Sequence, residues 1–102
     1  MTVMRLTVPD TVEPGKVADE VVVALADRLR DDHGYELDDS VSPVPPTSRL
    51  VYALRPRGSI VVDTDGALTV SLHQVDVDVR DLFIAVIGPL EQRYDGLFAE
   101  ID

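Results

Sequence analysis

Cysteine and tryptophan are absent from this 102-residue chain, and lysine occurs only once, at position 16. Without cysteine the chain can form no disulfide, no thiolate metal site and no cysteine nucleophile. Long apolar runs are also missing. None approaches the roughly 18 residues of a membrane-spanning helix, and residues 1–10 lack the apolar core of a signal peptide. We therefore expect a cytoplasmic protein, or a virion component if the chain serves viral assembly.

Basic residues are scarce relative to acidic ones. Nine Lys and Arg stand against 19 Asp and Glu, which gives a formal net charge of −10. An acidic surface repels nucleic acid and anionic lipid, so we expect neither nucleic acid nor a membrane as a partner. A hydrophobic fraction of 45% is typical of a globular protein, and we predict one domain over residues 1–102.

The first third of the chain predicts a strand followed by a helix. Residues 3–8 alternate weakly and end at Pro9, as a short strand would. A four-residue spacing of apolar residues then runs through positions 15–33, which predicts an amphipathic helix. Its expected buried stripe is Val17, Val21, Leu25 and Leu29. Gly34 suits the left-handed position that ends a helix.

Residues 35–48 contain three prolines, and we expect an extended Pro-rich connector there. Pro43 and Pro46 also match the P-x-x-P pattern that SH3-type grooves bind. A stiff crossover between the helix and the sheet is the favoured interpretation.

Three strands are predicted next, over residues 49–55, 59–63 and 67–73. The last of them alternates most clearly between apolar and polar residues, which is typical of an antiparallel strand with one solvent-exposed face. Residues 55–58, with Pro second and Gly fourth, predict a type I turn. The apolar positions change phase after Leu72, so we expect a bulge or a strand end at His73 and Gln74.

A second helix is predicted from residue 79 to residue 101, because apolar residues recur there at spacings of three and four. Asp78 is placed to cap its first turn. Pro89 should kink this helix, and the alternative is a strand over 82–87 with a helix starting at Pro89. The fold class expected is α+β, in the order β-α-β-β-β-α, with an antiparallel sheet and two helices packed on one of its faces.

One short stretch resembles part of a calcium-binding loop. Asp63, Asp65 and Gly66 match the D-x-D-G core of an EF-hand. The first and last ligands would then be Val61 and Leu72, and neither side chain can bind calcium. We predict instead a β-hairpin with a two-residue turn at Asp65 and Gly66.

Candidate residues for chemistry are few. His73, Asp76 and Asp78 are types that divalent metals accept, but a strand end and a helix cap separate them. Ser71 and His73 face outward from one predicted strand, without the nucleophile-elbow motif of a hydrolase. We therefore assign no catalytic, cofactor or metal site, and we expect a protein that is not an enzyme.

Two surfaces are candidates for binding. The single basic cluster of the sequence consists of Arg49, Arg55 and Arg57. We expect this cluster at one end of the sheet, where it could bind a phosphate or neutralise nearby acidic side chains.

The run from Leu82 to Ile87 is apolar around the whole helix, so one flank should meet the sheet and the other the first helix or another chain. The expected interaction surface is Leu82, Phe83, Ile84, Val86, Ile87 and Leu90.

These features favour a non-catalytic interaction or assembly subunit that self-associates through its helices, as a virion or other structural-assembly component would. The expected partner is a second copy of the chain, a larger assembly or another protein. One alternative is a chaperone-like or regulatory binding protein, and another is a metal- or ligand-responsive regulator that uses His73, Asp76 and Asp78.

Overall fold

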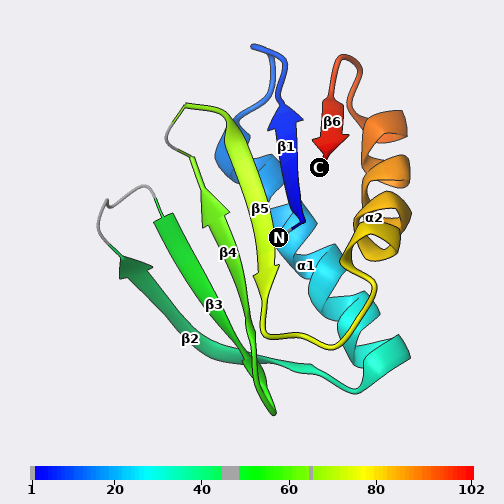
Figure 1. Ribbon diagram of the computed structural model, residues 1–102. Coiled ribbons are helices and arrows are strands. Elements are labelled where there is room, and N and C mark those ends of the chain that lie inside the picture. The colour runs from blue at the N-terminus through cyan, green and yellow to red at the C-terminus, as the bar shows by residue number, and fades with distance from the viewer. Residues whose placement is uncertain (1, 45–48, 65) are drawn as a thin grey trace.

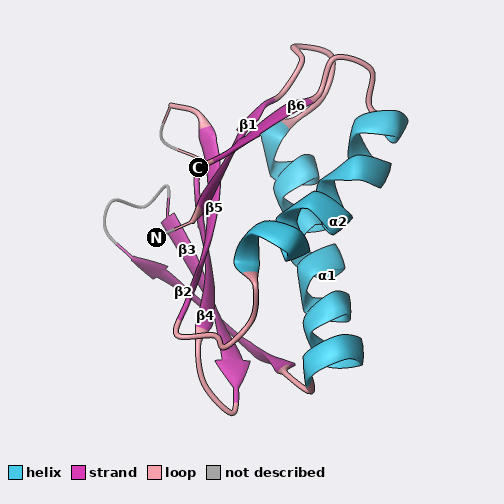
Figure 2. Cartoon of the chain, turned by 45° about the vertical axis from the view of Figure 1, so that its right-hand side comes forward, coloured by secondary structure: helices cyan, strands magenta, loops and turns pink. Residues whose placement is uncertain are grey.

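A computed structural model describes residues 2–44, 49–64 and 66–102 of the chain. These residues form two layers, a sheet and a pair of helices that cover one of its faces (Figures 1 and 2). The elements are β1 (Val3–Thr7), α1 (Pro14–His33), β2 (Glu36–Val44), β3 (Arg49–Arg55), β4 (Ser59–Asp63), β5 (Leu68–His73), α2 (Val79–Arg93) and β6 (Phe98–Ile101).

The sheet that the described residues form has six strands in the order β2-β3-β4-β5-β1-β6, and every neighbouring pair is antiparallel. The first strand lies inside the sheet, between β5 and β6. The two ends of the chain therefore meet, and the Asp102 N–H donates to the Val3 carbonyl at 3.1 Å. The α+β class, the antiparallel sheet and the two helices packed on one face are confirmed.

Strand β2 occupies most of the segment predicted as a connector. Residues 36–44 pair with β3, with an irregular register between Leu37 and Val41. Pro43 has no N–H to donate to a neighbour, and proteins tolerate this on an edge strand. β2 lies at the edge of the sheet, which explains why a Pro-containing segment joins it. Residues 45–48, which include the end of the P-x-x-P pattern, lie outside the described residues.

The second helix is shorter than its apolar spacing predicts. It ends at Arg93, and after Gly96, whose φ is +90°, the chain forms β6 beside β1. The periodic spacing of Leu97 and Ile101 was therefore misleading, because an alternating strand also places every second residue toward the core. Pro89 lies within the helix, so the alternative of a strand over 82–87 is wrong.

The core between the layers is built mainly from Val, Leu and Ile, as the composition predicts. The predicted stripe of α1 is confirmed, since each of its four residues has no exposed surface: Val17, Val21, Leu25 and Leu29. Gly34 ends this helix with a φ of +75°. The Asp78 carboxylate accepts the Asp81 N–H at 3.1 Å, which confirms the predicted cap of α2.

Strands β4 and β5 form the predicted hairpin, with Asp63 opposite Thr69. The connection covers residues 64–67, so the two-residue turn expected at Asp65 and Gly66 is wrong, and Asp65 lies outside the described residues. Gly66 has a positive φ, +78°. Strand β5 ends at His73, and Gln74 has a φ of +57°, so the predicted change of phase marks the end of a strand.

Candidate functional site

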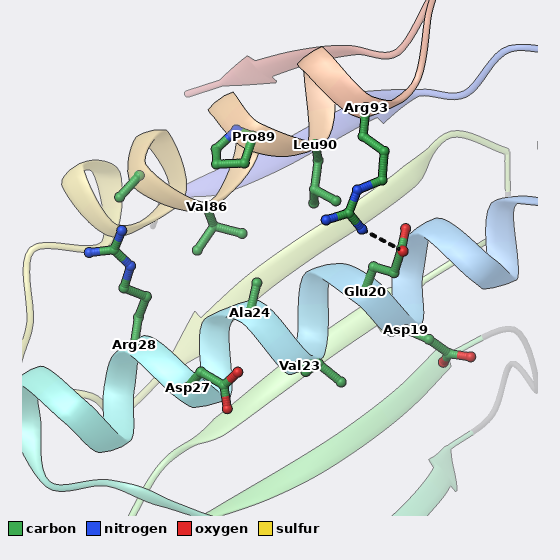
Figure 3. Close-up of a pocket in the computed structure, with 11 residues that line it drawn as sticks. Asp19, Glu20, Val23, Ala24, Asp27, Arg28, Val86, Pro89, Leu90 and Arg93 are labelled. Carbon is green, nitrogen blue, oxygen red and sulfur yellow. Dashed lines mark hydrogen bonds and ion pairs between the residues drawn. The ribbon is translucent and has the colours of Figure 1, made fainter.

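The two helices lie side by side on the sheet and leave a groove of about 470 Å³ between them (Figure 3). Its floor is formed by Ala24 of α1 and by Val86 and Leu90 of α2, which point toward one another. The charged residues that line the groove are Asp19, Glu20, Asp27, Arg28 and Arg93. The interhelical groove therefore combines an apolar floor with a charged rim.

Small residues keep the interhelical groove open. Ala24 and Ala85 bring only a methyl group to the two facing walls. Val23, at the outer edge of the groove, has 57% of its surface exposed, a large fraction for a valine. Pro89 has no N–H to donate to the Ala85 carbonyl, four residues earlier in α2. The groove is therefore open and apolar between its charged residues.

One end of the groove is closed by a polar cluster of Glu20, Arg93 and Tyr94. The Glu20 carboxylate accepts a hydrogen bond from the Tyr94 hydroxyl and pairs with the Arg93 guanidinium at 2.9 Å. The hydroxyl of Tyr94, and secondarily the charge of Arg93, lower the pKa of Glu20 even though partial burial opposes this. The same hydrogen bond raises the pKa of Tyr94. The cluster ties α1 to the end of α2.

Replacing Tyr94 by Phe should raise the pKa of Glu20 toward its ordinary value, because the hydroxyl is the main stabiliser of the charged carboxylate. We expect a smaller rise in Arg93→Met, since the charge of Arg93 is a lesser cause. A titration of the Glu20 side-chain carbon signal by NMR measures both shifts. An unchanged Glu20 titration in Tyr94→Phe would contradict the hydrogen bond.

The lowered pKa of Glu20 and the raised pKa of Tyr94 determine how the stability of the fold depends on pH. A lowered Glu20 pKa stabilises the fold above the ordinary carboxyl pKa, and this contribution is lost as the pH falls through the lowered value. A raised Tyr94 pKa stabilises the fold below the ordinary tyrosine pKa, and this is lost as the pH rises through the raised value. The cluster therefore contributes most between these two limits.

The predicted interaction surface on α2 lies mostly in the core. Five of its six residues are at most 7% exposed, and only Ile84, at 53%, faces outward. The buried five are Leu82, Phe83, Val86, Ile87 and Leu90. The sequence left the first helix or another chain to cover the second flank of α2. The structure places α1 beside this flank. Most of the predicted surface is therefore packed inside the chain, and Val23 is an exposed large hydrophobic side chain of the groove.

The sequence carries a signal for Val23 that the helical stripe does not use. Val21, Val22 and Val23 are consecutive, and a helix with one buried stripe cannot place all three in the core. Ala85 and Val86 of the groove belong to the apolar run of α2, but only the packing of α2 on α1 shows which flank of this helix stays open.

The three arginines predicted to cluster are not at one end of the sheet. Arg49 and Arg55 begin and end β3, so about 20 Å of strand separates them. Arg49 pairs with Asp63 at 3.2 Å and Arg55 with Asp38 at 3.3 Å. Both are therefore engaged with carboxylates of neighbouring strands.

His73, Asp76 and Asp78 do not converge either. The His73 ring shares a hydrogen bond of 3.0 Å with the Ser71 hydroxyl, whereas Asp78 caps α2. The Asp76 N–H donates to the Tyr35 hydroxyl at 3.0 Å. Among the residues that the structure describes, no three His, Asp or Glu side chains are grouped so that they could hold a metal ion.

Comparison with known proteins found no matching family model, no matching curated protein and no matching solved structure. Within the described part of the chain, neither helix has the length and apolar character to cross a bilayer. Function is therefore inferred from the residues and their geometry.

Proposed function

We propose that this protein is a non-catalytic interaction and assembly subunit, and that its interhelical groove binds an amphipathic helix of a partner protein. Val23 carries the proposal, because this valine is more than half exposed beside a floor of Ala24, Val86 and Leu90. Binding of an apolar helix face in a groove is a common mode of recognition. Burying an exposed valine contributes up to about 2 kcal/mol.

The charge of the protein favours a basic partner helix. The rim carries three acids and two arginines, and the whole chain has a net charge of −10. Lysines or arginines that flank the apolar face of a partner helix would be attracted by this field, whereas acidic flanks would be repelled. The complementary partner is thus a helix with a narrow apolar stripe and basic residues on both sides of it.

Titration of the ¹⁵N-labelled protein with a synthetic Leu/Lys amphipathic peptide tests the proposal. We expect shifts of the amide signals of Val23, Ala24 and Ala85, and binding that weakens as NaCl is added. A Leu/Glu peptide with the same apolar pattern should not bind. Val23→Asp should weaken binding of the Leu/Lys peptide about tenfold, since it removes apolar contact area worth about 1.4 kcal/mol.

Ile84→Asp is the matched control. Ile84 is also about half exposed, at 53%, and lies on α2 but does not line the groove. The two substitutions add the same negative charge to the helical layer, so a general electrostatic effect would strengthen binding of the basic peptide equally in both variants. Equal loss in Val23→Asp and Ile84→Asp, or signal shifts confined to the sheet, would refute the groove as the binding site.

A further inference from the structure

The face of the sheet opposite the helices is uncovered (Figure 2). It contains a shallow hollow of about 470 Å³ across β3, β4, β5 and β1. The register places Val51, Val61, Ser71 and Val3 side by side across this hollow. This row is apolar except at Ser71, and all four side chains are half-buried.

A charged row lies next to the apolar one, on the same face. The register aligns Arg49 of β3, Asp63 of β4, Thr69 of β5, Arg5 of β1 and Glu100 of β6. The alternation of strand residues confirms this face for β1, because Met4 and Leu6 are buried under the helices while Arg5 is exposed. The charges therefore read plus, minus, neutral, plus, minus across the sheet.

This order of charges is antisymmetric about Thr69. At one strand from β5, Asp63 on one side corresponds to Arg5 on the other. At two strands from β5, Arg49 corresponds to Glu100. A two-fold rotation about an axis along β5 exchanges the two sides, so each charge of the row would face an opposite charge in a second copy.

We propose that the open face of the sheet is the contact between two copies of this chain, related by a two-fold axis along β5. Arg49 then faces Glu100 of the second copy and Asp63 faces Arg5 of the second copy, each twice. In the apolar row, Val61 faces Val3 of the second copy. Two sheets packed face to face lie about 10 Å apart, a distance that arginine and carboxylate side chains can bridge together.

The balance of charge on this row favours a second copy over a basic or acidic partner. The row holds two positive and two negative side chains, although the whole chain has a net charge of −10. A neutral, patterned surface does not attract a partner of one charge, but it selects the orientation of a complementary surface. Phe98 adds an apolar ring to this face, since it is 54% exposed and pairs across the strands with Thr7.

This inference rests on the assembly role proposed above, and cysteine cross-linking separates the two. The chain has no cysteine, so an introduced cysteine is the single thiol of each copy that can react with the cross-linker. Thr69→Cys places it on the proposed axis, and Val23→Cys places it on the helical layer. With a short bis-maleimide, we expect a covalent dimer from Thr69→Cys and none from Val23→Cys. The reverse pattern would overturn the sheet contact and leave the assembly role standing.

Sedimentation equilibrium on the two aspartate variants provides the second measurement. Val61→Asp, which puts a charge into the apolar row, should weaken the dimer at least tenfold and still bind the Leu/Lys peptide, which also shows that it is folded. Val23→Asp should bind the peptide about tenfold more weakly and keep the dimer. A dimer unchanged in Val61→Asp, or a wild-type chain that stays monomeric up to millimolar concentration, would overturn the proposed contact without affecting the groove.

Discussion

Phe83→Ala should lower the free energy of unfolding by about 3–5 kcal/mol. The Phe83 ring has no exposed surface and is the largest fully buried side chain of the described core. Its removal loses the transfer free energy of the ring and leaves a cavity that the surrounding helices and sheet cannot close completely. A domain of this size has only about 5–15 kcal/mol in total, so the loss should be visible in any chemical denaturation curve.

The neighbouring substitution Ile84→Ala is the control for this prediction. Ile84 is 53% exposed, and substitutions at such surface positions usually change stability by less than about 0.5 kcal/mol. Urea denaturation of the two variants, followed by circular dichroism, compares two apolar residues that are adjacent in one helix. Similar losses in both would contradict the packing of α2, and a negligible loss in Phe83→Ala would place that ring outside the core.

Gly58→Ala should destabilise the protein by roughly 2–5 kcal/mol, through backbone strain and steric conflict together. Gly58 has a φ of +95° in the connection between β3 and β4. A Cβ at this position would lie 2.8 Å from the carbonyl oxygen of His73 and 2.8 Å from a methyl carbon of Val75. The carbonyl belongs to the backbone at the end of β5, so relief of the contact requires the hairpin to move.

Gly34→Ala separates the two contributions to this effect. Gly34 also has a positive φ, +75°, but a Cβ there would meet no atom within 4 Å. We expect it to cost only about 1 kcal/mol, the strain of the left-handed conformation less the entropy that alanine removes from the unfolded chain. Thermal denaturation of both variants measures the difference. Equal losses would show that the close contact at Gly58 contributes nothing.

Elements with a strong internal period could be predicted from the sequence. Val17, Val21, Leu25 and Leu29 recur every four residues, and each lies fully buried in α1. Leu68, Val70 and Leu72 alternate with polar residues and line the covered face of β5. In both cases the pattern reflects burial on one side of a single element, which depends on residues close together in the chain.

Strands β2 and β6 could not be predicted in the same way. Glu36–Val44 contains a proline and no alternation of the kind found in β5, and it becomes a strand because β3 offers an edge to pair with. Phe98–Ile101 continued a helical spacing, yet it pairs with β1, more than 90 residues away in the chain. The backbone hydrogen bonds of a strand are made with the neighbouring strand. The sequence of a short segment therefore does not by itself show whether that segment forms a strand.

The candidate binding surfaces also depend partly on local sequence and partly on tertiary packing. The apolar excess of α2 is visible in the sequence, but whether α1 or another chain covers its second flank is decided by how the helices pack on the sheet. The interhelical groove likewise needs Ala24, Val86 and Leu90 to face one another across two elements.

By itself, the sequence determined the acidic character of the protein, the first helix, the central strands and the α+β class, because each depends on composition or on local spacing. Only the tertiary structure decided where the open surfaces lie. The order Arg49, Asp63, Thr69, Arg5 and Glu100 arises after folding, since hydrogen bonding between strands sets the register that brings these residues into one row.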